Sequence, residues 1–289
     1  MHIPLKKLNN GFSMPVFGIG TWQMGGRVVH NPTNDDARDI AAIKAAIDLG
    51  VTHIDTAEMY AAGHAEELVA AAIKGHDRSK LFIVSKVLDV HLSHEDVIRS
   101  CKASLMRLNT PYLDLYLIHH PNPRIPLKET MAALDELKEQ GLVKNIGVSN
   151  FTAERMKEAQ SYTKNKIVAN QVHYNLLFRE PERRNLLKYC QDNDAFLIAW
   201  RPVEKGVLTN SGIPLLDALC KKYNKTPAQV AINWLISQKN VITLAKTSSL
   251  MHLNENLGAV GWTMDSADIE KLRKEFPGQQ DVSNAVPLL

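Results

Sequence analysis

The stretch from Leu81 to Ile118 contains one complete strand–helix–strand unit. It begins with Leu81-Phe82-Ile83-Val84-Ser85 and ends with Leu113-Asp114-Leu115-Tyr116-Leu117-Ile118, two short runs that are almost entirely apolar. Such runs are typical of strands that are buried on both faces of a parallel sheet. Between them, Ser93-His94-Glu95-Asp96 has the pattern of a capping box and predicts the start of a helix.

The same unit repeats along the whole chain. Further strands are predicted at residues 17–20, 52–55, 144–148, 167–171, 196–200 and 241–244. Further helices are predicted at 35–49, with Asn34 as the cap and Gly50 at the end, at 127–140, from Thr152, Glu180 and Pro227 onward, and at 265–275. Eight such units predict a (β/α)8 TIM barrel, with residues 1–289 as a single domain because no Pro/Gly/Ser-rich linker interrupts them.

The two ends of the chain are expected to lie outside the repeat. Asn9-Asn10-Gly11 is predicted to form a hairpin turn, so that residues 1–15 cap the barrel bottom, and residues 277–289 form a C-terminal tail. An open doubly wound sheet is the structural alternative. Such a sheet usually has fewer strands, and its nucleotide-binding fingerprint is missing, because Gln23 stands where the third glycine is required.

Composition excludes several classes of function. The chain has 34 Lys and Arg against 31 Asp and Glu, a net charge of +3, which argues against a nucleic-acid partner. No apolar run approaches the roughly 20 residues of a membrane span, and no secretory signal is visible at the N-terminus. Three widely spaced cysteines indicate neither disulfides nor a zinc knuckle. A cytoplasmic globular protein is therefore expected.

Four polar residues stand at or just after predicted strand ends, namely Asp55, Tyr60, Lys86 and His119. Each has an ordinary structural explanation by itself: a turn residue, a buried aromatic ring, a solvated charge or a core histidine. In a TIM barrel, however, the carboxyl ends of all strands meet at one mouth, where active sites lie. The convergence of all four residues therefore favours a catalytic site.

The strand-end motifs resemble those of the aldo-keto reductase family. The resemblance extends in order over nearly the whole chain, to about Phe276. It is carried by Gly18-Ile19-Gly20-Thr21-Trp22, Asp55-Thr56-Ala57-Glu58-Met59-Tyr60, Ser85-Lys86, Leu117-Ile118-His119 and Gly147-Val148-Ser149-Asn150-Phe151. It implies NADPH-dependent reduction of an aldehyde or ketone to an alcohol, with no catalytic metal.

Elementary chemistry agrees with these roles. Tyrosine, with an ordinary pKa of about 10, is neutral at pH 7 and can give a proton to the forming alkoxide. The Lys86 ammonium is expected to move the pKa of Tyr60 toward neutrality, and Asp55 to balance the buried Lys86. His119 is expected to donate a hydrogen bond that orients the substrate oxygen.

The resemblance also implies a cofactor site. Ser149, Asn150 and Gln171 match residues that bind the nicotinamide carboxamide, and Trp200 stands where many members have a tyrosine that stacks on the ring. The strand-one end supplies Gly20, Thr21 and Trp22. Arg201, Pro202, Val203, Gly206 and Leu208 belong to a strap over the diphosphate, and Lys246, Thr247, Ser248, His252, Glu255 and Asn256 to the adenosine 2′-phosphate and adenine site.

His252 stands where many members have arginine, and histidine is a weaker, pH-dependent partner for phosphate. We therefore expect a preference for NADPH with a modest margin, and weaker use of NADH. Trp22, Leu88 and His120 are predicted to line the substrate pocket. Because the loops around it are short, an open, shallow mouth is expected, suited to small aldehydes, dicarbonyls or sugar-like carbonyls.

Two other functions are weighed against this one. Some members of the family serve as nucleotide-sensing regulatory subunits with little turnover, and intact catalytic residues do not exclude that role. A metal-dependent hydrolase on the same barrel would need clusters of histidines and carboxylates at several strand ends. An H-x-H motif after strand one would be an example, but Gly20-Thr21-Trp22 stands there instead. The histidines of His91-Leu92-Ser93-His94 lack an acidic partner in register and are not expected to bind metal. A monomer is expected.

Overall fold

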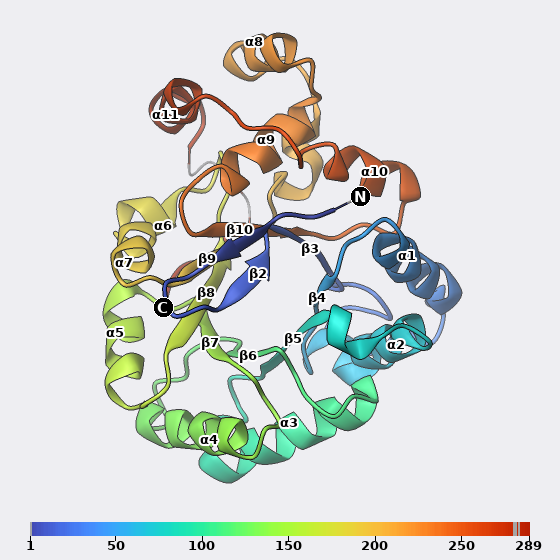
Figure 1. The fold of residues 1–289 in the computed structure, drawn as a ribbon, viewed down its shortest axis with the longest axis vertical. Helices are drawn as coiled ribbons and strands as arrows, with labels where there is room; N and C mark the ends of the chain where they lie inside the picture. The colour runs from blue at the N-terminus through green and yellow to red at the C-terminus, as the bar shows by residue number, and fades with distance from the viewer. Residues whose placement is uncertain (1, 280–281, 283) are drawn as a thin grey trace.

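Eight parallel strands close into a barrel in the computed structural model, which describes residues 2–279, 282 and 284–289 (Figure 1). The strands are β3 (Phe17–Gly20), β4 (His53–Asp55), β5 (Phe82–Val87), β6 (Leu115–Ile118), β7 (Ile146–Ser149), β8 (Ile167–His173), β9 (Phe196–Trp200) and β10 (Val241–Ala245). They are hydrogen-bonded in chain order, and β10 pairs with β3 to close the ring. The predicted TIM barrel is thus confirmed, strand by strand.

Helices surround the strands, and most of them form a ring (Figure 1). They are α1 (Asp36–Asp48), α2 (His64–Ile73), α3 (His94–Leu108), α4 (Leu127–Glu139), α5 (Ala153–Ser161), α6 (Glu180–Arg183), α7 (Leu186–Asp192), α8 (Pro214–Tyr223), α9 (Pro227–Ile236), α10 (Leu250–Leu257) and α11 (Ser266–Glu275), with short 3₁₀ segments η1 (Tyr60–Gly63), η2 (Arg78–Lys80) and η3 (Glu204–Thr209). The helices α8 and α11 lie outside the ring and contact each other. The sequence patterns gave no boundaries for α2, α7, α8 and α10.

The cap of α1 differs from the prediction. The capping residue is Asp35, whose carboxylate accepts a hydrogen bond from the backbone N–H of Arg38 at 3.0 Å. Asn34 instead donates its side-chain amide to Asp36 and Asp39, at 2.8 and 2.9 Å. The prediction of Asn34 as cap was therefore wrong by one residue, because its amide is engaged by the carboxylates of the first turn.

The N-terminal hairpin closes the bottom of the barrel, as predicted. Its strands are β1 (Leu5–Lys7) and β2 (Ser13–Pro15), joined by a turn in which Gly11 has φ of +90°. The hairpin buries Leu8 and Met14 against the apolar side chains inside the barrel. The Phe12 ring also packs 6.0 Å from that of Phe82 and 5.9 Å from that of Phe196, near the amino ends of β5 and β9.

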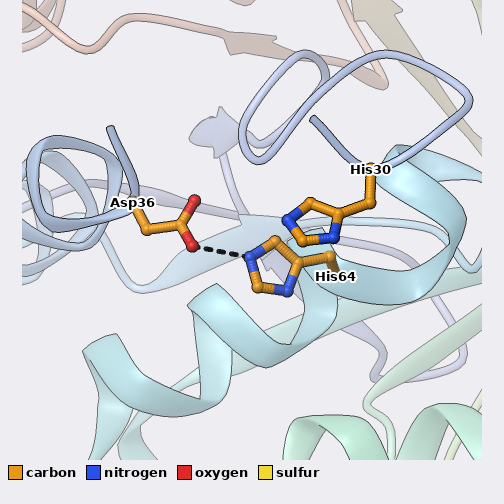
Figure 2. A group of neighbouring side chains, drawn as sticks. All are labelled: His30, Asp36 and His64. Atoms are coloured by element: carbon orange, nitrogen blue, oxygen red, sulfur yellow. Dashed lines mark hydrogen bonds and ion pairs between the residues drawn. The ribbon is translucent and has the colours of Figure 1, made fainter. Parts of the chain in front are cut away.

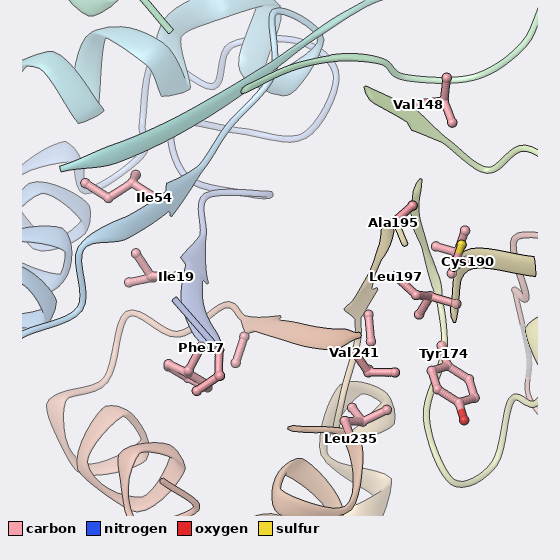
Figure 3. Close-up of a cluster of buried hydrophobic side chains, with 14 of the residues drawn as sticks. Phe17, Ile19, Ile54, Val148, Tyr174, Cys190, Ala195, Leu197, Leu235 and Val241 are labelled. Atoms are coloured by element: carbon pink, nitrogen blue, oxygen red, sulfur yellow. The ribbon is translucent and has the colours of Figure 1, made fainter. Parts of the chain in front are cut away.

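The core has two layers. Alternate strand residues face outward and pack against the helices, and Figure 3 shows part of this layer, with Ile19 from β3, Ile54 from β4 and Leu197 from β9. The remaining residues, such as Val84 and Leu117, fill the barrel interior above the hairpin. Because the bottom is sealed with apolar groups, the polar strand ends are left to form a site at the opposite mouth.

The C-terminal tail returns to this mouth. The backbone N–H of Leu289 donates to the carbonyl of Asn150 at 2.9 Å, and the N–H of Thr152 donates to the carbonyl of Leu289 at 3.1 Å. Of the predicted tail 277–289, residues 280, 281 and 283 lie outside the described residues, as does Met1 of the predicted cap. Within the described ranges, none of the helices has the length and apolar character to cross a bilayer.

Candidate active site

A cavity of about 220 Å³ opens at the carboxyl ends of the strands. It brings together three of the four predicted catalytic side chains, and the fourth, Lys86, lies directly beneath them. The lining residues are Gly20, Trp22, Asp55, Met59, Tyr60, His119, His120, Ser149, Asn150, Gln171, Trp200, Arg201, Leu244, Lys246 and Val286. Met59, Leu244 and the tail residue Val286 were not predicted, whereas Leu88 was predicted and is not among the lining residues.

Lys86 is the centre of a buried hydrogen-bond network. Its Nζ donates to Asp55 Oδ1 at 2.6 Å, to the carbonyl of Thr56 at 2.8 Å and to the Tyr60 hydroxyl at 3.3 Å. The second carboxylate oxygen of Asp55 accepts from Gln171 Nε2 at 2.7 Å. Lys86 is fully buried and Asp55 is 1% exposed, so each charge depends on the other for compensation.

Burial and neighbouring charges have opposing effects on the pKa values of Lys86 and Tyr60. Burial by itself favours neutral Lys86, but the Asp55 carboxylate and the Tyr60 hydroxyl outweigh it and raise the pKa of Lys86 above its ordinary value. Burial also raises the pKa of Tyr60; the Lys86 ammonium opposes that shift, and the Asp55 charge adds to it. The net direction for Tyr60 is upward, opposite to the expected move toward neutrality, so Tyr60 holds its proton firmly in this structure.

The segment that carries Tyr60 has an unusual backbone. Ala61 and Ala62, which follow Tyr60 in η1, have φ values of +52° and +54°, a left-handed conformation that alanine rarely adopts. Their backbone N–H groups donate to the carbonyls of Arg27 and Val28, at 2.6 and 2.8 Å. The loop after β3 therefore holds the tyrosine segment in a conformation that its own sequence does not favour.

His119 faces Tyr60 across the cavity. Its ring lies 5.6 Å from the Tyr60 ring in an edge contact and stacks on His120 at 4.9 Å. Burial, with smaller effects from Lys86 and His120, holds the pKa of His119 well below its ordinary value. A neutral His119 keeps one ring N–H, which is available to donate to an oxygen in the cavity.

The predicted carboxamide-binding residues lie together on the β7–β8 side. The Asn150 amide donates to the carbonyl of His119 at 2.9 Å and to the Ser149 hydroxyl at 3.0 Å. Its own oxygen, Oδ1, is buried and has no hydrogen-bond partner. A buried acceptor without a donor is costly, so Asn150 Oδ1 fits the amide N–H of a carboxamide placed in this cavity.

The Trp200 ring is held in position by aromatic stacking. Its ring lies on the His173 ring at 4.5 Å and 14°, and His173 in turn lies on Phe178 at 4.2 Å. Trp200 lines the cavity, and the Arg201 guanidinium lies over its ring, with Cζ 4.8 Å from the ring centroid. A nicotinamide that stacks on Trp200 would therefore lie beside Arg201. His173 was not predicted, although the alternation of side chains along a strand places it on the same face as Gln171, two residues earlier.

The predicted diphosphate strap is held to β8 and the segment after it by Glu204, whose role was not predicted. Glu204, 3% exposed, accepts hydrogen bonds from His173 Nε2 at 2.6 Å and from the Asn175 amide at 2.7 Å. Arg201, Glu204, Lys205 and Gly206 all have positive φ values, so this loop is tightly turned. The contacts to β8 thus hold its backbone beside the mouth of the cavity.

A second, polar cavity of about 540 Å³ adjoins the first through Lys246. Lys246, Thr247, Ser248 and His252, which were predicted to bind the adenosine 2′-phosphate, lie together in its lining near the start of α10. Opposite them, Asp39 of α1 accepts from the Ser248 hydroxyl at 2.9 Å. The predicted cofactor residues that line neither cavity are Thr21, Pro202, Val203, Gly206, Leu208, Glu255 and Asn256.

Comparisons with known proteins agree with this geometry. Residues 16–275 match the model of the Aldo/keto reductase family. Methylglyoxal reductase YeaE of Escherichia coli is 36% identical over 92% of both chains. The solved structure of the thermostable aldo-keto reductase Tm1743 has a TM-score of 0.90 and 41% identity, covering 93% of this chain and 98% of its own. That of an aldo-keto reductase from Klebsiella pneumoniae in complex with NADPH has a TM-score of 0.83 and 32% identity, with 99% coverage of both.

Proposed function

This chain belongs to the aldo-keto reductase family, and on that premise we propose that it reduces small carbonyl compounds to alcohols with NADPH. The observation that carries the proposal is the Tyr60 hydroxyl, 3.3 Å from the Lys86 ammonium and across one cavity from His119. A proton donor and a second hydrogen-bond donor thus face the same space. This is the arrangement needed where a carbonyl oxygen becomes an alkoxide.

The residues divide the work as follows. NADPH, when bound, supplies the hydride. Tyr60 gives its proton to the substrate oxygen, and the Lys86 ammonium makes the resulting tyrosinate less costly. Asp55 keeps Lys86 charged, and His119 orients the oxygen by a hydrogen bond. Asn150 and Trp200 support the nicotinamide end, and Lys246 and His252 the phosphate end. No residue in this scheme requires a metal.

The substrate class follows from the size and lining of the cavity. The nicotinamide would share the space of about 220 Å³, so only a small substrate would fit beside it, and His120 and Arg201 give the rim polar character. Small aldehydes and dicarbonyls are therefore proposed, in line with a relative named methylglyoxal reductase. We further propose that the protein works as a monomer in the cytoplasm, with no nucleic-acid or membrane partner.

A panel of carbonyl substrates separates this function from its rival, a nucleotide-sensing regulatory subunit. The wild-type protein is expected to consume NADPH with at least one small aldehyde or dicarbonyl and to form the matching alcohol. Tight NADPH binding without turnover on every aldehyde and ketone in the panel, together with assembly into a stable oligomer, would favour the regulatory subunit instead.

The pH dependence of reduction should be flat around neutrality. Tyr60 must be protonated to act, and its raised pKa keeps it so beyond its ordinary value of 10. His119 stays neutral at and above pH 6.5, because its lowered pKa lies below that ordinary value, so the ring N–H that orients the substrate does not change. We therefore expect kcat/KM to be constant from about pH 6.5 to about pH 9. A decline with a midpoint inside that range, lost in His119→Gln or Tyr60→Phe, would contradict the assignment.

Cofactor preference tests the phosphate site. The wild-type protein is expected to bind NADPH more tightly than NADH, by a modest margin. His252→Arg should widen that margin by about fivefold, roughly 1 kcal/mol, because arginine offers a permanent charge and a bidentate fork to the 2′-phosphate. Dissociation constants for both nucleotides, measured by fluorescence, provide the test. A preference for NADH in the wild type, or equal effects of the substitution on both nucleotides, would refute it.

A further inference from the structure

Three residues outside the active site bring possible metal ligands together. His30 lies in the loop between β3 and α1, Asp36 is the first residue of α1, and His64 is the first residue of α2. One ligand atom from each lies within 4.8 Å of the other two. Figure 2 shows the two imidazole rings lying one over the other, with the Asp36 carboxylate at their edge. The reaction proposed above uses none of these residues.

Each ring nitrogen of His64 lies at hydrogen-bond distance from a carboxylate. Its Nε2 lies 2.7 Å from Asp36 Oδ2, and its Nδ1 lies 2.7 Å from Glu67 Oε2. Metal-bound histidines commonly donate their second ring N–H to a carboxylate, which fixes the ring and raises its basicity. Glu67 is in place to accept that hydrogen bond, and a metal ion on Nε2 would replace the hydrogen bond between Nε2 and Asp36.

His30 is also held in position by its backbone. His30 and Gly26 form an isolated antiparallel bridge, and the N–H of Asn31 donates to the carbonyl of Gly25 at 2.8 Å. The His30 ring packs 4.1 Å from the His64 ring, centroid to centroid. The loop is therefore folded back in such a way that an exposed histidine lies against a half-buried one, rather than pointing freely into solvent.

We propose that His30, Asp36 and His64 bind a divalent transition-metal ion of the zinc class, with Glu67 orienting His64. Two imidazole nitrogens and one carboxylate suit Zn²⁺, Co²⁺ or Ni²⁺ better than Mg²⁺ or Ca²⁺, which prefer oxygen ligands only. Tetrahedral zinc places its ligand atoms about 3.3 Å apart, so no separation here has to shrink by more than about 1.5 Å, and the His64 Nε2–Asp36 Oδ2 distance of 2.7 Å has to lengthen by about 0.6 Å. The exposed His30 side chain can move that far.

The ion would act on the fold rather than on the substrate. Residues 27 and 28 of the His30 loop accept the backbone hydrogen bonds of Ala61 and Ala62, just before His64. A metal bound by both histidines would link the His30 loop to the start of α2. These are the two segments that flank the hydrogen bonds holding the backbone after Tyr60. The proposed ion would therefore be structural and would link two segments beside the active site. Its three protein ligands leave a fourth coordination position for water.

Metal titration of the full chain tests this proposal. Protein stripped with a chelator is titrated with Zn²⁺ by calorimetry and with Co²⁺ by visible absorption. We expect one ion per chain and the absorption of a low-coordinate Co²⁺ site. His30→Gln and His64→Gln should each weaken binding by more than about a hundredfold, and Glu67→Gln by about tenfold to a hundredfold.

A matched control is available in His94→Gln. His94 pairs with Glu136 at 3.3 Å on the surface, a histidine–carboxylate pair without a second histidine, and its loss should leave the affinity unchanged. Because His30 is exposed, His30→Gln leaves the core intact and keeps the comparison valid if His64→Gln fails to fold. Absence of stoichiometric binding to the wild type, or equal affinity of wild type and His30→Gln, would overturn the proposal.

Discussion

Tyr60→Phe should lower kcat for carbonyl reduction by about 10²- to 10⁴-fold while leaving NADPH binding intact. The substitution removes only the hydroxyl that donates the proton. The phenyl ring can keep its contacts with Trp22 at 5.1 Å and His119 at 5.6 Å, so the cavity should retain its shape. Steady-state kinetics with a carbonyl substrate and a fluorescence titration with NADPH measure the two effects separately.

Tyr112→Phe provides the matched control for this experiment. Tyr112 lies outside the cavity, where its ring contacts Arg78 and Lys144, and a phenyl ring preserves both contacts. Its kcat should equal that of the wild type. Reduction at near wild-type rate in Tyr60→Phe would show that another group supplies the proton.

Lys86→Met should damage both catalysis and stability. Without the ammonium, tyrosinate formation at Tyr60 becomes more costly, and kcat should fall by about a hundredfold or more, since each unit of pKa change is worth about tenfold. Asp55, only 1% exposed, would also lose its compensating charge. An uncompensated buried charge costs about 3–5 kcal/mol, so the free energy of unfolding should fall by that amount in a denaturant titration.

The double variant Asp55→Asn/Lys86→Met separates the two effects. Removing both charges relieves the buried carboxylate, so most of the lost stability should return, whereas turnover should stay low because the ammonium is still missing. Recovery of turnover together with stability would mean that Lys86 acts only through the fold. Near wild-type kcat in Lys86→Met alone would exclude its role toward Tyr60.

Much of this architecture could be predicted from local sequence. The apolar runs predicted all eight barrel strands, because a strand that is buried on both faces carries a strong local signal. Since parallel strands end at one mouth, the positions of Asp55, Tyr60, Lys86 and His119 in the sequence were enough to place them together. The cap of α1 was misplaced by one residue, because Asn34 and Asp35 are both good capping residues and only side-chain geometry separates them.

Other features depend on contacts between segments that are distant in the sequence, so local sequence patterns do not predict them. Glu204 bonds to His173, 31 residues earlier, and the contact exists only because β8 and β9 are neighbours in the closed barrel. The left-handed backbone at Ala61 and Ala62 is imposed by the loop after β3 and contradicts the preference of alanine. The upward shift in the pKa of Tyr60 likewise depends on how deeply the ring is buried, which the sequence pattern does not give.

Isotope transfer tests the central claim most directly. A small aldehyde or dicarbonyl is reduced with NADPH that carries deuterium at the transferable position of the nicotinamide, and the alcohol is analysed by mass spectrometry. The account predicts one deuterium on the former carbonyl carbon with wild-type protein, and a rate of labelled product at least about a hundredfold lower with Tyr60→Phe. Unlabelled alcohol from the wild type, or labelled alcohol formed equally fast by Tyr60→Phe, would contradict it.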